Sequence, residues 1–316
     1  MAKYTSESWP IAAAMLPFAP SQDADQETWI TQLAEVAFEG FTAVDLTDSW
    51  VRIGDMDADR LAQLRDALTA TGLEPIAASI IRKSVIDPEH GEENLEYSHR
   101  SLEAAAQLEI PTVSFGLHRP LLADQQNVQW FWTEDGPVDD EREETWELAA
   151  NRLRSLGEHA QSLGIEVSLE MYEDTLIGTV PGTLKLLEKI GLENVGANPD
   201  LGNLYRLHRE IEDFQAAVVS LSPVTNYWHV KSYYRDVDEK QNLITTVPAP
   251  METGSMNYRT AIKHAVESGF RGAFCVEHYG GDGLSVSAMN ARYIRKILAV
   301  ALGEARRLVL KEAKNV

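Results

Sequence analysis

Four residues of types that bind divalent metals stand at the ends of four successive short apolar segments. Glu170 closes the segment Val-Ser-Leu-Glu, Asp200 closes Asn-Pro-Asp, and Glu277 closes Cys-Val-Glu. His229 lies inside another segment, Tyr-Trp-His-Val-Lys. Each residue taken alone could be an ordinary salt-bridge partner, but buried carboxylates are costly unless they are paired or bound to metal. Their succession therefore predicts one divalent-metal site, with Mn²⁺ favoured and Mg²⁺, Co²⁺ or Zn²⁺ compatible.

Side chains close to these segments could contact a substrate. Lys231 lies two positions after His229, so both side chains face the same way along a strand. Lys231 could polarise a substrate oxygen, or it could form a salt bridge with Asp45 or Glu170. Asp45 closes an earlier apolar segment and is itself a candidate for contact with the substrate.

Two aromatic residues add further candidates. His118 comes shortly after the apolar segment Thr112–Gly116. Its imidazole could serve as an acid or base near neutral pH, or it could be an ordinary loop histidine. Tyr172 follows Glu170 closely and could stack on a sugar ring, although such a residue more often serves packing.

The chemistry that these residues predict is proton abstraction next to a carbonyl. A divalent metal that holds two adjacent oxygens of a hydroxyketone acidifies the neighbouring C–H bond. Glu170 and Glu277 are the candidate bases, with His118 in reserve, and the step gives an enediolate. Return of the proton elsewhere is isomerisation or epimerisation, whereas expulsion of a leaving group is a lyase reaction. A non-catalytic sugar-binding barrel is a further alternative, against which the complete ligand set argues.

The elements that must position these residues follow a repeated pattern. An amphipathic helix ends, often at a glycine, and a short apolar run follows it, as in HAQSLGIEVSLE and HAVESGFRGAFCVEH. Such runs are typical of strands buried on both faces of a parallel sheet. Eight strands alternate with helices, which predicts a (β/α)8 barrel, and the last helix spans about 285–311. The strands are expected at 12–17, 42–46, 75–80, 112–116, 166–170, 196–199, 227–231 and 273–277.

The whole chain of 316 residues fits one barrel domain, 1–316. One segment, at about 119–144, is too long for an ordinary connection and is rich in acidic and aromatic residues, with Trp130, Phe131 and Trp132 in succession. Because it follows the fourth strand, it lies on the face where barrels carry their active sites. We expect this insertion to cover the mouth of the barrel or to contact another chain; a decorated surface loop is the alternative.

Composition excludes several classes of function. The net charge of −21 argues against a nucleic-acid partner, because phosphate binding needs a basic surface. The sequence has no apolar run long enough for a membrane span and no sign of a signal peptide at its start. Its single cysteine, Cys275, excludes an intramolecular disulfide and favours a cytoplasmic location.

The chain resembles the xylose isomerase-like barrel superfamily of sugar isomerases and epimerases. The resemblance rests on SLEMYED, GANPDLGNL, HVKSYYR and GAFCVEHYGG, and it extends over nearly the whole chain. It implies that Glu170, Asp200, His229 and Glu277 are the metal ligands. It also places Arg235, six residues after His229, on an arginine with which ketose 3-epimerases bind their substrate.

One departure from this pattern concerns Asn203. Many epimerases of the superfamily have a histidine three residues after the aspartate, where this chain has Asn203, for which we also expect substrate contact. The departure keeps two lyase alternatives open, an inosose-type dehydratase and the large subunit of a C-glycoside deglycosidase that acts on 3-oxo-glycosides. We accordingly expect a sugar substrate and either a homo-oligomer or a complex with a small partner subunit.

Overall fold

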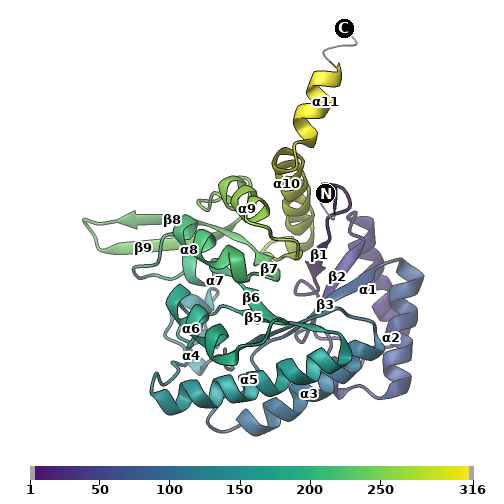
Figure 1. The fold of residues 1–316 in the computed structure, drawn as a ribbon, viewed down its shortest axis with the longest axis vertical. Helices are drawn as coiled ribbons and strands as arrows, with labels where there is room; N and C mark the ends of the chain where they lie inside the picture. The colour runs from purple at the N-terminus through teal and green to yellow at the C-terminus, as the bar shows by residue number, and fades with distance from the viewer. Residues whose placement is uncertain (1–3, 313–316) are drawn as a thin grey trace.

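Eight parallel strands form the centre of the molecule in a computed structural model, which describes residues 4–312 except for the side chains of 308, 311 and 312 (Figure 1). Their residues are almost all buried, which explains why the strands are continuous apolar runs in the sequence. The strands are β1 (Ile11–Ala14), β2 (Ala43–Thr47), β3 (Glu74–Ile80), β4 (Thr112–Gly116), β5 (Glu166–Glu170), β6 (Val195–Asn198), β7 (Tyr227–Val230) and β10 (Ala273–Val276).

The order of the strands is that of a nearly closed barrel. Neighbours follow the series β6-β5-β4-β3-β2-β1-β10-β7, and every pairing is parallel. One isolated bridge joins the two ends of this series. It pairs Ala197, which lies in β6, with Thr225, which comes just before β7. The predicted (β/α)8 barrel is therefore confirmed, with a weakly paired seam between β6 and β7.

Helices surround the strands on the outside of the barrel (Figure 1). Helix starts follow from side-chain caps, since Asp25 accepts a hydrogen bond from the amide of Thr28 and Asp57 one from that of Arg60. The longer helices are α1 (Gln26–Phe38), α2 (Ala58–Thr71), α3 (Gly91–Gln107), α5 (Glu143–Leu163), α6 (Val180–Ile190), α8 (Phe214–Leu221), α9 (Tyr258–Glu267) and α10 (Gly283–Ala301). The structure contains no helix among residues 4–312 that is both long and apolar enough to cross a membrane.

The C-terminal helix differs from the prediction of one helix over 285–311. It is divided into α10 and α11 (Glu304–Glu312), and α11 extends away from the barrel (Figure 1). Gly303 lies between them with φ +71°, a left-handed conformation that ends a helix and that glycine adopts at low cost.

A hairpin after β7 has no counterpart in the sequence prediction. Strands β8 (Ser232–Asp238) and β9 (Leu243–Ala249) pair antiparallel outside the barrel, with Arg235 opposite Thr246. The insertion that follows β4 contains a short helix, α4 (Ala123–Gln126), and a 3-10 turn at Phe131–Thr133. The insertion and the hairpin meet where the indole N–H of Trp132 donates to Thr246 Oγ1 at 3.1 Å. Two other 3-10 turns, Ile53–Asp55 and Ser222–Val224, and the short helix α7 (Leu201–Tyr205) complete the fold.

Candidate metal centre and active site

The four predicted metal ligands lie at the carboxyl ends of their strands. Glu170 is the last residue of β5 and His229 is in β7, while Asp200 and Glu277 come just after β6 and β10. All four side chains are buried, with at most 7% of any residue exposed. The parallel barrel thus brings together residues that are more than a hundred positions apart in the chain.

Three of these residues form a group of the right size for one metal ion. One ligand atom each from Glu170, Asp200 and His229 lies within 4.8 Å of the others. Asp200 Oδ1 is buried and has no hydrogen-bond partner among the described residues, which leaves a lone pair for a cation. Glu277 adjoins this group, with its Oε1 2.7 Å from His229 Nδ1. Two buried carboxylates, one of them with an unsatisfied oxygen, and an imidazole fit a divalent metal. We call these three residues together with Glu277 the metal group.

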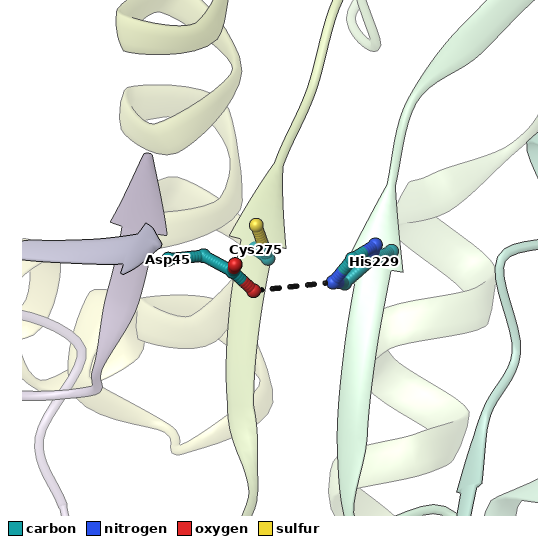
Figure 2. A group of neighbouring side chains, drawn as sticks. All are labelled: Asp45, His229 and Cys275. Carbon is teal, nitrogen blue, oxygen red and sulfur yellow. Dashed lines mark ion pairs between the residues drawn. The ribbon is translucent and has the colours of Figure 1, made fainter. Parts of the chain in front are cut away.

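A second cluster lies behind the first one and is less suited to a metal. Asp45, His229 and Cys275 converge there, with Asp45 Oδ2 3.4 Å from His229 Nε2 (Figure 2). Burial raises the pKa of the Cys275 thiol well above its ordinary value, so the sulfur stays protonated and is a poor ligand. The same Asp45 oxygen already accepts from Tyr227 Oη at 2.5 Å and from Ser79 Oγ at 2.8 Å.

Asp45 is therefore placed to orient His229. A metal-binding histidine commonly directs its second ring nitrogen to a carboxylate, which fixes the tautomer and the ring orientation. In this arrangement Nε2 faces Asp45, while Nδ1 faces Glu170 and Glu277. Asp45 is fully buried, and its predicted contact with the substrate stays a prediction.

The charge of the group depends on Lys231, whose ammonium bridges two of the carboxylates. Its Nζ donates to Asp200 Oδ2 at 2.5 Å and to Glu277 Oε2 at 2.8 Å. Burial by itself would raise the pKa of Glu277, but Lys231 and His229 outweigh burial and lower it. Lys231 thus forms its salt bridges with Asp200 and Glu277, and not with Asp45 or Glu170 as the sequence alternative had it.

Asn203 holds Glu170 rather than facing an open space. Its Nδ2 donates to Glu170 Oε1 at 3.2 Å and to the carbonyl of Met171 at 3.0 Å. Burial raises the pKa of Glu170 to about 7, although the neighbouring His229 lowers it. These contacts orient the Glu170 carboxylate, and substrate contact by Asn203 stays a prediction.

His118 and Tyr172 stack on each other beside the metal group, with ring centres 4.4 Å apart. His118 is buried, and its Nδ1 has no hydrogen-bond partner among the described residues. Burial lowers the pKa of His118 well below its ordinary value, and the cations Arg82, Arg206 and Lys231 lower it further. The imidazole is therefore neutral at physiological pH and is able to accept a proton.

Arg235 does not point its guanidinium toward the metal group. It donates to the backbone carbonyls of Tyr205 at 3.0 Å, of Arg209 at 2.6 Å, and of Leu207. The cause is the β8–β9 hairpin, which carries Arg235 onto the loop after α7. The predicted role of Arg235 in substrate binding is untested, and the position of its guanidinium does not support it.

Arg206 is a candidate that the sequence analysis missed. It follows α7 directly and is completely buried, with its Nη2 2.9 and 3.0 Å from the two carboxylate oxygens of Glu173. Glu173 lies within SLEMYED, and Arg206 comes just after GANPDLGNL. No local signal in the sequence marks either residue, because Arg and Glu are ordinary surface residues that often form exposed pairs. Only the burial distinguishes this pair.

Aromatic side chains of the insertion cover this part of the barrel mouth. Trp132 is buried and contacts Tyr233 and Tyr279, with ring centres 5.5 and 5.8 Å apart. Phe131 contacts Tyr279 edge to face at 6.1 Å. Tyr279 in turn lies 5.3 Å from the ammonium of Lys231, so the insertion is one ring away from the metal group.

The pattern of strands and the match to a family model agree. The model of the xylose isomerase-like TIM barrel family matches residues 32–298. The chain belongs to this family. A member from Mycobacterium smegmatis, whose crystal structure is a complex with magnesium, is 39% identical over 95% of this chain and 99% of that one, with a TM-score of 0.91.

More distant structures share the fold of this family member. An L-ribulose 3-epimerase is 15% identical over 95% of this chain and 98% of its own, with a TM-score of 0.70. A mannonate dehydratase from Streptococcus suis is 13% identical over 94% of both chains, also with a TM-score of 0.70. No curated protein sequence matches the chain.

Proposed function

We propose that the protein is a divalent-metal-dependent enzyme that removes a proton next to the carbonyl of a sugar-like hydroxyketone. The observation that carries this proposal is the buried group of Glu170, Asp200 and His229, with Glu277 in contact with His229. A magnesium complex of a relative with 39% identity is consistent with metal binding here. Mn²⁺ is the metal that we favour, because the ligand set has more oxygens than nitrogens.

Each residue of the group has a separate task in this proposal. When bound, the metal would supply Lewis-acid polarisation of the substrate oxygens. Glu170 and Glu277 come from different sides of the group, so one carboxylate can take a proton from a carbon placed between them. Lys231 lies against Glu277 at 2.8 Å and can neutralise the oxyanion that forms after the proton has left.

His118 is the reserve acid or base. Its imidazole is neutral because burial lowers its pKa, and its Nδ1 is free of hydrogen bonds within the described part of the chain. A neutral imidazole can take a proton from a substrate hydroxyl or return one to carbon. Two bases on different elements are what an epimerase needs to remove a proton from one face and return it on the other.

A lyase that uses the same intermediate is the second candidate. The rings of Phe131, Trp132, Tyr233 and Tyr279 lie beside the metal group and could surround an apolar leaving group. An aromatic leaving group expelled from a 3-oxo-glycoside would pack against these rings. An inosose-type dehydration expels water and would not need aromatic rings nearby. Analysis of the products separates the lyase reactions from epimerisation. The expected homo-oligomer or small partner subunit and the cytoplasmic location stay predictions.

The test combines metal binding with solvent exchange. Metal content and Mn²⁺ affinity are measured on the purified protein, and ketoses, inososes and 3-oxo-glycosides are then incubated with it in D₂O. We expect NMR to show loss of a carbon-bound hydrogen next to the carbonyl. Glu170→Gln should slow this exchange by about 10²–10⁴-fold. Glu166→Gln, at the exposed opposite end of β5, is the matched control and should change nothing.

Two outcomes would contradict the proposal. One is a protein that binds no divalent metal at millimolar concentrations. The other is equal exchange by the Glu170→Gln and Glu166→Gln variants. A protein that hydrolyses simple glycosides or phosphates, with neither exchange nor a deuterium isotope effect on substrate turnover, would instead use the metal to activate water.

A further inference from the structure

Arg206 has hydrogen-bonding capacity that the protein does not use. The residue is completely buried, and its Nη2 donates to the carboxylate of Glu173, with the hydroxyl of Tyr233 as a further polar neighbour of the guanidinium. Its Nε and Nη1 have no hydrogen-bond partner among the described residues. A buried donor without a partner costs free energy, so these two nitrogens are placed to donate to a further acceptor.

The guanidinium lies inside a shell of aromatic rings. Its central carbon is 4.7 Å from the ring centre of Phe131, 5.0 Å from that of Trp132, 5.4 Å from that of Tyr172 and 5.8 Å from that of Tyr279. The rings keep water away, which strengthens charge-assisted hydrogen bonds to a ligand. Two of the rings, those of Phe131 and Trp132, belong to the insertion, which therefore covers Arg206.

A second arginine gives this shell a surplus of positive charge. Arg82 lies over the ring centres of Phe131 and Tyr172 at 5.2 and 5.7 Å and is half-buried. Its guanidinium donates to the carbonyl of Arg119 at 3.0 Å and to Tyr172 Oη at 3.2 Å, but it has no ion-pair partner within residues 4–312. Glu173 neutralises Arg206 but leaves Arg82 without a counter-ion. A local net charge of one positive unit is notable in a chain with a net charge of −21. Arg82 also has φ +53°, an uncommon conformation for a residue other than glycine that is often kept at functional sites.

The shell is next to the metal group. Lys231 Nζ and the guanidinium carbon of Arg206 lie 5.3 and 5.8 Å from the centre of the same ring, that of Tyr279. The two cations are thus no farther apart than the sum of these distances. His118 connects the two regions, since Arg82, Arg206 and Lys231 all contribute to lowering its pKa.

We propose that Arg206, assisted by Arg82, binds a carboxylate of the substrate, so that the substrate class is a sugar acid held by the metal group at its hydroxyketone end. A carboxylate would accept from the unused Nε or Nη1 of Arg206 and would balance the charge of Arg82. A neutral sugar would leave that charge without a counter-ion. This inference rests on the proposed function for the hydroxyketone end only.

The test compares two ligands that differ in one group. D-fructose and D-fructuronate share the hydroxyketone, and the second carries a carboxylate at its far end. Binding of each to the full-length protein with Mn²⁺ is measured by isothermal titration calorimetry. We expect fructuronate to bind at least about tenfold more tightly, as a charge-assisted hydrogen bond would require.

Three variants move this preference in different directions. Arg206→Lys keeps the positive charge beside Glu173 but lacks the two free donors, so it should lose about tenfold in affinity for fructuronate and little for fructose. Arg82→Gln should lose a similar factor without disturbing a buried ion pair. Glu173→Gln removes a negative charge and should bind fructuronate more tightly than the wild type. A purely structural role of the arginines would change binding of both sugars equally.

Controls separate this inference from the proposed function. Mn²⁺ affinity and the melting temperature of each variant show whether the metal group and the fold are intact, and Arg82→Gln remains informative if Arg206→Lys does not fold. Equal binding of the two sugars by the wild type, or no binding of fructuronate at millimolar concentrations, overturns the inference. So does a preference that Arg206→Lys and Arg82→Gln both retain. Failure of the proposed function would instead appear as missing proton exchange in D₂O. The binding measurement does not depend on that exchange, so the two failures can be distinguished.

Discussion

At the scale of single residues, the ammonium of Lys231 occupies oxygens that the proposed divalent metal would also use. Lys231 bonds one oxygen each of Asp200 and Glu277, and it is almost fully buried with them. Without the ammonium, the carboxylates would repel each other unless a metal were bound, because burial weakens their solvation. We therefore expect Lys231 to stabilise the metal-free protein and to compete with a bound metal.

We predict that Lys231→Met binds Mn²⁺ more tightly than the wild type, by about tenfold, because one positive charge is removed from beside the ligands. The same variant should unfold more easily without metal and regain stability when Mn²⁺ is added. Calorimetric titration and urea unfolding with and without Mn²⁺ measure both effects. Lys231→Arg keeps the charge and serves as control, and unchanged or weaker Mn²⁺ binding by Lys231→Met would contradict the competition.

At the scale of elements, Asp139, near the C-terminal end of the insertion, attaches the insertion to the loop between β5 and α6. One oxygen of this carboxylate accepts from the amide of Leu176 at 3.1 Å, and the other is 3.6 Å from Arg119. The amide of Asp139 donates to the carbonyl of Asp174 at 2.8 Å. Burial raises the pKa of Asp139 to about 6, although Leu176 and Arg119 lower it.

This pKa gives the attachment a dependence on pH. The pKa of Asp139 is higher in the folded chain than in the unfolded chain, so the folded state binds more protons between about pH 4 and pH 6 and its stability falls as the pH rises through that range. The loss amounts to about 3 kcal/mol at most. Asp139→Asn cannot titrate but keeps an acceptor for Leu176. We therefore predict that the wild type loses stability relative to this variant between about pH 5 and about pH 7.5.

Urea unfolding of both proteins at the two pH values measures this difference, and other titrating groups cancel because the two chains share them. A wild type that gains stability relative to Asp139→Asn over the same range would refute the sign. The result also bears on access to the site, because the insertion carries Phe131 and Trp132, which cover Arg206.

At the scale of the whole molecule, side chains supplement the one backbone bridge that closes the barrel at the seam between β6 and β7. Asn226 accepts from Ser168 Oγ at 2.7 Å and donates to the carbonyl of Val167 at 2.9 Å, both in β5. Across the seam, the side chain of Asn198 in β6 accepts from the amide of His229 in β7 at 2.7 Å. The position of His229 in the metal group thus depends on the closure.

We predict that Asn226→Ala lowers the free energy of unfolding by about 1–3 kcal/mol per buried group left without its partner. Metal affinity should fall as well, because the seam positions β7 and its His229. Urea unfolding and Mn²⁺ titration test this, with the exposed Asn127→Ala in the insertion as control. Equal stability of the two variants would show that the backbone bridge at Ala197 closes the barrel without help.

The barrel and the convergence of the four candidate ligands could both be predicted from the sequence because each depends on a local pattern. Apolar runs after helix-ending glycines identify the strands, as at Gly164 before β5. Once the strands are parallel and closed into a barrel, their carboxyl ends must converge, so Glu170, Asp200, His229 and Glu277 meet without any further information. The family resemblance in the motifs around them added the same four residues.

The tertiary structure alone decided the surroundings of that group. Arg206 directly follows a short helix, and only packing by residues from three distant segments makes it a buried cation with unused donors. The β8–β9 hairpin turns Arg235 away from the site that its spacing from His229 had indicated. Local periodicity determines which face of an element is buried, but what a side chain contacts above the strand ends depends on loops whose paths follow from packing against one another.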